Sequence, residues 1–349
     1  MFAAARGVIA AGLEARAFPA AVIEVGRMDR AIWREAFGQL SYAHDAALCT
    51  TDSIFDLASL TKVICTTPLT MRVISDDQLA LATPLSRVVS RWRGADRSAV
   101  TIRHLLDHSS GLPAHERFWE RGLDRAGIEQ AICEAPLTSP PGTASVYSDL
   151  GFMLLGFLLE DLDGRDLDGQ FSALPIAADD LIMFCPPADL LPRIAPTEDD
   201  PWRGRVLCGD VHDENAAVLG GVAGHAGLFG TAGAVGGFAR TVLRTFREPT
   251  WIGTPDLMSQ FAQRTAVPGS SRALGWDTMR PTSSCGTLMC PTAIGHTGFT
   301  GTSLWIDYEK DLYVAFLTNR VHPTRKNDAH IAIRPRLHDA IVSEFLKSG

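Results

Sequence analysis

The sequence predicts an α/β domain that is interrupted by a mostly helical insertion. Two segments near the start, Ala20–Gly26 and Ala31–Gly38, carry alternating or β-branched residues around a short polar turn, which is typical of an antiparallel hairpin. Strand-like segments return only from Leu274 onward, and the residues between these two regions have mainly helical patterns. The two ends of the chain are therefore expected to form one sheet.

The expected boundaries follow from these changes in pattern. We assign residues 1–57 and 271–349 to a discontinuous sheet domain and residues 58–270 to the mostly helical domain. At 349 residues and 46% hydrophobic, the chain can bury the large core that this arrangement needs. A formal net charge of −8 and an isoelectric point near 5.7 argue against nucleic acid or an anionic membrane as a partner. No apolar run approaches the roughly 18 residues of a membrane-spanning helix.

The N-terminal residues and the cysteines indicate the compartment. The first residues are small and apolar, but Glu14 and Arg16 interrupt any signal-peptide core. We therefore expect an amphipathic helix and a cytoplasmic protein; a periplasmic protein trimmed of its signal would look the same. Seven scattered cysteines favour reduced thiols over a disulfide framework. Cys285 and Cys290 lack the spacing of a zinc site, so no metal and no cofactor are expected.

The other elements are expected in the following order. After Lys62 the pattern is helical, and Pro68 should kink this helix or end a segment. A short helix within residues 101–113 is closed by glycine and proline. Its His104 and His108 are assigned to packing or capping, because no third metal ligand is evident. Four strands and a final helix follow: Leu274–Met279, Ala293–Thr297, Thr302–Asp307, Leu312–Thr318 and Arg334–Leu346.

Ser59 and Lys62 form the first motif with a chemical meaning. If a helix begins near Ser59, the three-residue spacing places its hydroxyl and the Lys62 amine on one face. A serine hydroxyl needs a neighbouring base before it becomes a nucleophile, and a desolvated lysine can be that base. A capping serine followed by a surface lysine would give the same pattern, so this motif alone leaves both interpretations open.

Tyr147 and Asp149 follow a Pro/Gly turn and precede a helix that should start near Leu150. Tyr147 could shuttle a proton if a nearby ammonium favours its phenolate. A packed aromatic residue and a helix N-cap are the alternative roles for these two side chains.

Two further segments contain candidate site residues. Gly295–Gly301 should be a glycine-rich strand that lets a substrate backbone approach closely, or else a hairpin with a hydrogen-bonded histidine. His212 and Asn215 lie in a polar run that we expect to border the substrate cleft from the helical side, although a capped surface turn is an equal alternative.

Taken together, these motifs resemble those of a known family. Ser59-x-x-Lys62, Tyr147-Ser148-Asp149 and His296-Thr297-Gly298 are similar, in this order, to the three motifs of the penicillin-recognising serine hydrolases. The chain looks like the class C β-lactamase-related group, which includes serine-type D-alanyl-D-alanine carboxypeptidases, D-aminopeptidases and family VIII carboxylesterases. The resemblance covers nearly the whole chain and includes features of a bacterial penicillin-binding-protein-like subgroup. It implies an antiparallel sheet flanked by helices, a helical domain, and an active site between the two.

The resemblance also implies a mechanism and site residues. Ser59 would attack an ester or amide carbonyl and form an acyl-enzyme, with Lys62 and Tyr147 handling its proton; which of them is the immediate base stays open. The backbone N–H groups of Ser59 and Phe299 would form the oxyanion hole. The expected substrate-binding residues are Asp149, His296, Thr297, Gly298, His212 and Asn215.

Two departures from the family pattern bear on the substrate. The middle motif usually ends in asparagine, but an ionised Asp149 can only accept hydrogen bonds. The third motif carries His296 where typical β-lactamases carry lysine, so a fixed positive charge becomes a mostly neutral ring. We therefore expect a carboxylesterase-type enzyme with weak β-lactamase activity on small-molecule substrates, its oligomeric state undetermined. The alternatives are a peptidase for short D-amino-acid peptides from cell-wall fragments, and a covalent β-lactam sensor that does not turn over.

Overall fold

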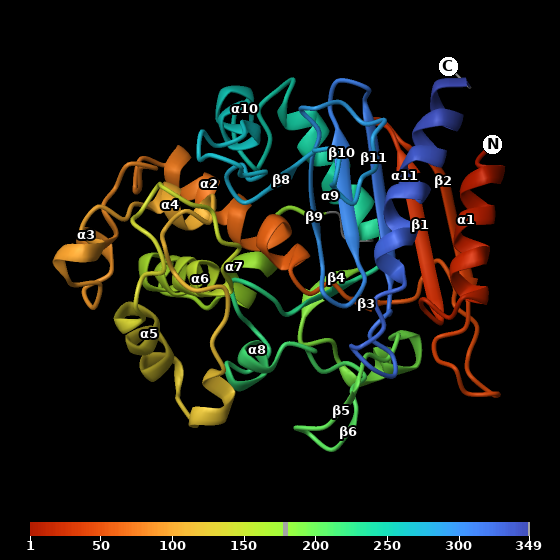
Figure 1. Ribbon diagram of the computed structural model, residues 1–349, viewed down its shortest axis with the longest axis horizontal. Helices are drawn as coiled ribbons and strands as arrows, with labels where there is room; N and C mark the ends of the chain where they lie inside the picture. The colour runs from red at the N-terminus through yellow and green to blue at the C-terminus, as the bar shows by residue number, and fades with distance from the viewer. Residues whose placement is uncertain (177–180, 348–349) are drawn as a thin grey trace.

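The computed structural model describes residues 1–176 and 181–347, and its central feature is a six-stranded antiparallel sheet (Figure 1). The strands lie in the order β2-β1-β11-β10-β9-β8. Strand β1 therefore pairs with β2 on one side and with β11, from the end of the chain, on the other, which confirms that the two ends form one sheet. The bounds are β1 (Ala20–Gly26), β2 (Ala31–Gly38), β8 (Asp277–Thr278), β9 (Ile294–Thr297), β10 (Ser303–Asp307) and β11 (Leu312–Thr318).

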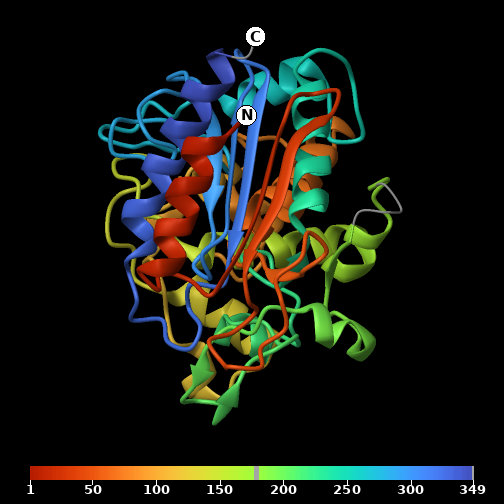
Figure 2. The same ribbon diagram turned by 90° about the vertical axis from the view of Figure 1, so that its right-hand side faces the viewer.

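Helices cover both faces of this sheet. Helices α1 (Ala3–Glu14) and α11 (His330–Lys347) lie side by side on one face, whereas α9 (Ala232–Thr245) packs against β1 and β11 from the other (Figure 2). Strand β1 shows why its sequence is apolar almost throughout. Its residues alternate between two hydrophobic clusters: Val22 packs in the larger cluster, and Ile23 in the cluster beneath α1 and α11.

The rest of the chain is mainly helical and lies beside the sheet (Figure 1). Helix α6 (Asp149–Asp163) is at its centre and is buried from Leu150 to Leu159. A Cβ atom on Gly224 would lie 2.2 Å from the carbonyl oxygen of Phe152, so only glycine lets the loop at 224 pass this close to α6. The other helices are α2 (Thr67–Ser75), α3 (Leu85–Val88), α4 (Ile102–Leu106), α5 (Arg125–Glu134), α7 (Leu167–Ser172), α8 (Glu214–Val218) and α10 (Pro255–Ala262).

Two small sheets complete the described structure. Strands β3 (Phe55–Asp56), β7 (Leu228–Gly230) and β4 (Ile182–Phe184) pair antiparallel in the order β3-β7-β4. Strands β5 (Asp199–Asp200) and β6 (Arg205–Val206) form a short hairpin that projects from the molecule (Figure 1). No helix in the described ranges combines the length and apolarity that crossing a membrane would take.

The structure agrees with most of the elements predicted from the sequence and shifts some bounds. The helix that begins at Leu60 contains a π-helical turn, Lys62–Thr66, which continues directly into α2, and Pro68 follows this turn. The final helix begins at His330, four residues before the predicted start, and includes Pro335.

The predicted division into two domains stays a prediction. Helix α9 falls inside residues 58–270, which we assigned to the helical part, yet it packs against the sheet. Its Gly236 lies against the buried Glu24 of β1, and Arg240 makes an ion pair with the same carboxylate at 2.9 Å. The sheet part therefore includes at least one helix from the middle of the sequence.

Candidate active site

A sharp turn after β3 presents Ser59. The preceding residue, Ala58, has a positive φ of 47°, a strained conformation for a residue with a side chain. Its N–H donates to Asp56 Oδ1 at 2.8 Å, which holds the turn in place. The helix starts at Leu60, so Ser59 lies half-buried at a junction between strand and helix.

Lys62 is completely buried and lies next to Ser59, as the three-residue spacing predicted. Its Nζ donates three hydrogen bonds: to Ser59 Oγ at 2.9 Å, to Asp149 Oδ1 at 2.7 Å and to the backbone carbonyl of His225 at 3.0 Å. An ammonium group has three N–H donors and no acceptor, so these contacts use its full capacity. This arrangement excludes a role for Lys62 as a surface residue.

The charges around Lys62 determine its protonation. Burial alone would lower the pKa of Lys62, but the adjacent Asp149 carboxylate and Tyr147 outweigh it, and the net pKa lies above the usual value. Burial would raise the pKa of the Asp149 carboxyl, yet the Lys62 ammonium holds it well below its usual range. The resting site therefore contains a Lys62–Asp149 ion pair.

Tyr147 lies among nitrogen-bearing side chains. Lys62 Nζ is 5.0 Å from the centre of its ring and the Arg272 guanidinium carbon is 4.8 Å from it. The rings of His108 and His296 lie 4.7 Å and 5.7 Å away, centre to centre. Burial raises the pKa of the Tyr147 phenol, while the charge of Lys62 and hydrogen bonds to Lys62 and Ser59 act in the opposite direction. The resting phenol is therefore neutral, and its ionisation is assisted by the same lysine.

The turn between β9 and β10 is fastened to the segment that leads to Ser59. Thr302 Oγ1 donates to the carbonyl of Leu57 at 3.0 Å, and Thr300 Oγ1 donates to the carbonyl of Asp56 at 2.7 Å. A Cβ atom at Gly298 would lie 2.6 Å from the Leu57 carbonyl oxygen, so this close approach requires glycine. The sequence predicted a close approach by substrate, but at Gly298 it is the chain's own backbone that approaches.

Two backbone N–H groups at this junction are free. Within residues 1–176 and 181–347, neither the N–H of Ser59 nor that of Phe299 donates a hydrogen bond to another residue. Both residues line one cavity of about 680 Å³. Free N–H donors beside a nucleophile are the feature that stabilises an oxyanion.

Charged and aromatic side chains from the helical part and from the β5–β6 hairpin line the same cavity. Its other lining residues are Ala58, Ala114, His115, Arg117, Trp119, Tyr147, Asp149, Asp200, Pro201, Trp202, His212, Asp213, Glu214, Ala226 and Arg325. The aromatic rings of Trp202 and Phe299 are about half exposed, at 45% and 49%. They give the cavity an apolar rim around a polar floor.

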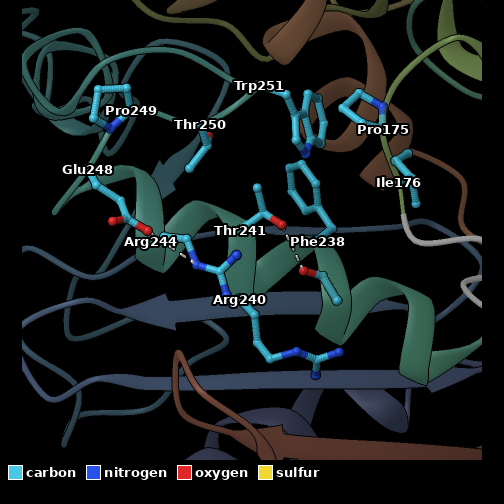
Figure 3. Close-up of a pocket in the computed structure, with 11 residues that line it drawn as sticks. Pro175, Ile176, Phe238, Arg240, Thr241, Arg244, Glu248, Pro249, Thr250 and Trp251 are labelled. Atoms are coloured by element: carbon cyan, nitrogen blue, oxygen red, sulfur yellow. Dashed lines mark hydrogen bonds and ion pairs between the residues drawn. The ribbon is translucent and has the colours of Figure 1, made fainter.

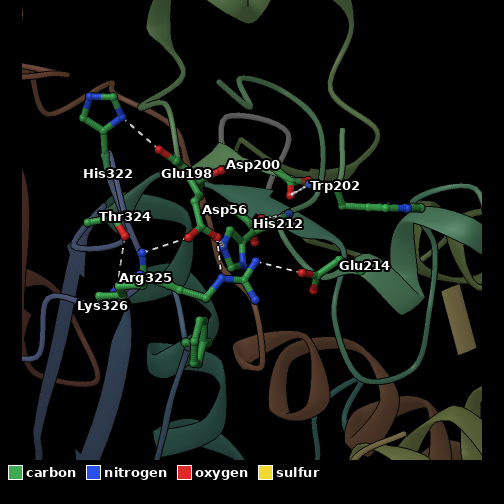
Figure 4. A network of polar contacts seen from close by, with 12 residues as sticks. Asp56, Glu198, Asp200, Trp202, His212, Glu214, His322, Thr324, Arg325 and Lys326 are labelled. Atoms are coloured by element: carbon green, nitrogen blue, oxygen red, sulfur yellow. Dashed lines mark hydrogen bonds and ion pairs between the residues drawn. The ribbon is translucent and has the colours of Figure 1, made fainter. Parts of the chain in front are cut away.

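A polar network forms one wall of this cavity (Figure 4). Glu198 accepts hydrogen bonds from Arg325 and is 3.0 Å from His212 Nε2, and Arg325 also pairs with Glu214 at 2.8 Å. Burial would raise the pKa of Glu198, but its hydrogen bonds to His212 and Arg325 lower it to about 2. His212 stacks on Phe299, with ring centres 5.6 Å apart. The network thus fixes the position of the Phe299 side chain.

Some of the predicted site residues line the cavity and others do not. His212 lines it, but Asn215 is fully buried and joins two backbone groups, accepting from Phe118 N–H and donating to the Glu116 carbonyl. His296 lies beside Tyr147, and neither His296 nor Thr297 belongs to the cavity lining. The side chains of His212 and Asn215 are both buried, and Asp213 between them caps α8, so the role of the 212–215 segment in substrate binding stays a prediction.

His296 has a defined tautomer. Its Nδ1 lies 2.9 Å from the Thr297 carbonyl and must carry the proton, which leaves Nε2 as a buried acceptor without a partner in the described part of the chain. Burial and the nearby cations Arg272 and Lys62 hold the pKa of His296 well below its usual value. The ring is therefore neutral at physiological pH, as the sequence predicted.

Sequence reasoning missed several groups at the site. His225 contributes only its backbone carbonyl to Lys62, and no side-chain pattern could reveal such a contact. His115 lies 3.6 Å from the second oxygen of Asp149. Among the described residues, the guanidinium of Arg272 has no hydrogen bond and no ion pair. A second cavity along α9 is lined by Phe238, Arg240 and Trp251, among others, and by none of the predicted site residues (Figure 3).

The fold and this family of motifs define a class of protein: a serine hydrolase with a β-lactamase-like fold. The chain belongs to the beta-lactamase family, whose model matches residues 5–336. It is 27% identical to a putative D-alanyl-D-alanine carboxypeptidase of Escherichia coli K12, covering 87% of this chain and 79% of that protein. It is 30% identical to an N-acetylmuramyl-L-alanine amidase of Bacillus subtilis, covering 88% and 78%.

Solved structures show the same fold. One is EstCE1, described as a hydrolase with promiscuous acyltransferase activity, with a TM-score of 0.76 and 20% identity over 96% of this chain and 97% of that chain. Another is a penicillin-binding protein homologue from Caulobacter crescentus, with a TM-score of 0.77 and 17% identity over 98% and 97%. At these identities the likeness concerns the fold alone.

Proposed function

We propose that this protein cleaves esters or amides through an acyl-enzyme on Ser59, most readily as a carboxylesterase with weak β-lactamase activity. The observation that carries this proposal is the fully buried Lys62, whose ammonium donates to Ser59, to Asp149 and to the His225 carbonyl. A buried lysine is costly unless it is paired, and here its pairing brings it against a serine hydroxyl beside free N–H groups.

The proton of Ser59 passes to Tyr147 in this proposal. The Lys62 ammonium has no lone pair and cannot accept a proton while Asp149 keeps it charged. Its charge instead lowers the energy of the Tyr147 phenolate, which is the form that acts as base. The active form is therefore the minor, ionised form of Tyr147, and Lys62 acts by stabilising it.

The acyl transfer then proceeds in two steps. Ser59 Oγ attacks the carbonyl carbon, the new oxyanion accepts from the N–H groups of Ser59 and Phe299, and the leaving group takes the proton held by Tyr147. Water attacks the acyl-enzyme in the second step, with Tyr147 again accepting the proton. Both carbonyl-addition steps use the same pair of N–H groups.

The cavity favours uncharged acyl substrates. Its rim is apolar at Trp119, Trp202 and Phe299, and its charged groups are largely paired with one another, as Glu214 is with Arg325. Neutral His296 gives a β-lactam carboxylate no full charge to bind. The substrate-binding role of Thr297 and Gly298 rests on the motif alone.

A D-amino-acid peptidase is the second candidate, and one observation favours it. Arg272 lies over the ring of Tyr147 and has no anionic partner among the described residues, so its guanidinium is available to bind the terminal carboxylate of a short peptide. The relative described as a putative D-alanyl-D-alanine carboxypeptidase has a name consistent with this substrate class. A change of Arg272 to alanine would then weaken peptide hydrolysis and leave ester hydrolysis unaffected.

A substrate panel tests the proposal. The wild type and Ser59→Ala are assayed with short-chain p-nitrophenyl esters, D-amino-acid anilides, a D-alanyl-D-alanine peptide and a chromogenic cephalosporin. We expect the highest kcat/KM on the esters and no turnover by Ser59→Ala. Faster peptide hydrolysis would favour the second candidate, and a single burst without steady-state turnover would indicate a covalent sensor. Retention of more than a few per cent of activity by a folded Ser59→Ala variant would exclude Ser59 as the nucleophile.

A further inference from the structure

Arg334 is a buried cation without an anionic partner. It lies on α11 with only 6% of its surface exposed, and no carboxylate in the described ranges is within ion-pair distance of it. The neighbouring charge that acts on its pKa is another cation, Arg320. Burial and that neighbour lower the pKa of Arg334 to about 9, so it is still charged at neutral pH. An unpaired buried charge is destabilising, and its presence requires an explanation.

The guanidinium of Arg334 faces the turn between β9 and β10. Its Nη2 donates to the Thr302 carbonyl at 2.9 Å and to the Gly298 carbonyl at 3.4 Å. Both carbonyls also accept a backbone N–H within the turn, Thr302 from Gly298 at 2.7 Å and Gly298 from Gly301 at 3.1 Å. The turn therefore keeps its own hydrogen bonds without Arg334, and satisfying these carbonyls does not account for the buried charge.

The position of the Gly298 carbonyl explains the buried charge of Arg334. This carbonyl belongs to the same peptide group as the N–H of Phe299, which is free and lies at the cavity that contains Ser59. A cation at the oxygen end of a peptide group draws electron density toward that end and makes its N–H a stronger donor. An anion that forms in front of the Phe299 N–H would then be the missing partner of Arg334.

We infer that Arg334 is a positioning residue of the oxyanion hole, which holds the Gly298–Phe299 peptide and strengthens its N–H toward the negative charge that develops during acyl transfer. This inference rests on the proposed acyl-enzyme mechanism at Ser59. The charge acts through one peptide group and touches no substrate. Its effect should therefore be smaller than the roughly 10²–10³-fold cost of removing an oxyanion donor, and we expect about tenfold.

For Arg334→Met, the inference predicts a loss of activity without a loss of stability. Removal of an unpaired buried charge, with the turn's backbone hydrogen bonds intact, should leave the thermal midpoint unchanged or raise it. The kcat for an ester should nevertheless fall about tenfold with KM unchanged, because the lost interaction is made only in the transition state. Arg334→Lys keeps a charge at this position and should recover most of the loss.

The experiment measures three quantities on purified wild type, Arg334→Met and Arg334→Lys: kcat and KM for a p-nitrophenyl ester, the inhibition constant of an arylboronic acid, and the thermal midpoint. The boronate adduct carries a negative charge when the serine adds to it, so its affinity should fall by the same factor as kcat. His338→Gln is the matched control. It changes another buried polar side chain one turn along α11, whose Nδ1 lies 2.8 Å from the Arg334 carbonyl.

Each outcome decides the question. Wild-type kcat and boronate affinity in Arg334→Met would overturn the inference. So would a loss of stability or a failure to fold, because either would make Arg334 a structural residue. An equal loss of activity in His338→Gln, or no recovery in Arg334→Lys, would do the same. Turnover by Ser59→Ala would instead overturn the proposed function, so the two failures are distinguishable.

Discussion

Replacement of Asp149 by asparagine tests the ion pair at the centre of the site. Asparagine keeps the shape of the side chain and an oxygen that can accept from Lys62, but it removes the negative charge 2.7 Å from the buried Nζ. The structure predicts that the folded protein then contains a buried ammonium without a counter-charge. We expect a loss of stability and a lower pKa of Lys62.

The magnitude follows from the geometry. With an effective dielectric constant of about 20, two unit charges at this separation attract by roughly 6 kcal/mol, which is an upper bound. The asparagine oxygen retains a hydrogen bond and the Asp149 side chain is 18% exposed, so we expect a loss of about 3 kcal/mol. For a chain of this size that corresponds to a fall of about 4 °C in the thermal midpoint.

Both members of the Lys62–Asp149 pair determine how the stability of the protein changes with pH. The pKa of Asp149 is lowered in the folded state, so its stabilisation is present above the unfolded pKa of about 3.9 and is lost as the solution becomes more acidic. The pKa of Lys62 is raised, so its stabilisation is complete below about pH 10 and is lost only above it. The deficit of the variant should therefore be constant from about pH 5 to pH 9.

Thermal unfolding followed by circular dichroism across this pH range is the assay. Asp161→Asn is the matched control, because Asp161 lies on the same helix and pairs with Arg125 at 2.8 Å but is 59% exposed. Its loss should be below about 1 kcal/mol. Equal midpoints for the Asp149 and Asp161 variants would refute the claim that the Lys62–Asp149 pair is a strong buried interaction.

Three further outcomes are expected. Lys62→Ala and Tyr147→Phe should each lower kcat by at least about 10²-fold in stopped or continuous ester assays. A folded variant with near-wild-type kcat would show that the replaced residue takes no part in proton transfer. The kcat/KM of the wild type should rise with pH above 7, because the active form of Tyr147 is ionised and its pKa is raised; a flat profile from pH 7 to 10 would contradict this role. Gly298→Ala should destabilise the protein and reduce ester turnover, because its Cβ would lie 2.6 Å from the Leu57 oxygen. A crystal structure of an active variant with an unmoved turn would show the reasoning to be wrong.

The fold was largely predictable from local patterns, because each pattern has a direct physical cause. The hairpin of β1 and β2 follows from two apolar segments around a polar turn, and its predicted bounds are the observed ones. The association of both chain ends in one sheet followed from where strand patterns stop and return. The packing of α9 on the sheet was not predictable, because an amphipathic helix does not specify which surface it covers.

Contacts within the site were predictable where two residues lie a few positions apart in one motif. Contacts that only the tertiary fold creates were not predictable. The three-residue spacing places Lys62 beside Ser59, and this contact is observed. Asp149 was expected to bind substrate, and its ion pair with Lys62, a partner 87 residues away in the chain, could not be read from the motif. Arg272 and Arg334 carry no local signal of their positions, since a single arginine in a sequence is normally exposed.

The pairing of β1 with β11 has a consequence for how the molecule is made. Ala21 pairs with Thr318, so the sheet cannot close until the chain has been synthesised beyond residue 318. Until then the apolar face of the β1–β2 hairpin lacks its main partner and has to be kept from associating with other chains. The segment around Phe299 follows Ser59 by some 240 residues, so the junction that joins the oxyanion turn to Ser59 forms only after that segment has been synthesised. A nascent chain that ends before this segment would thus carry Ser59 and Lys62 without the complete site, so hydrolysis has to wait for the strands around residue 299.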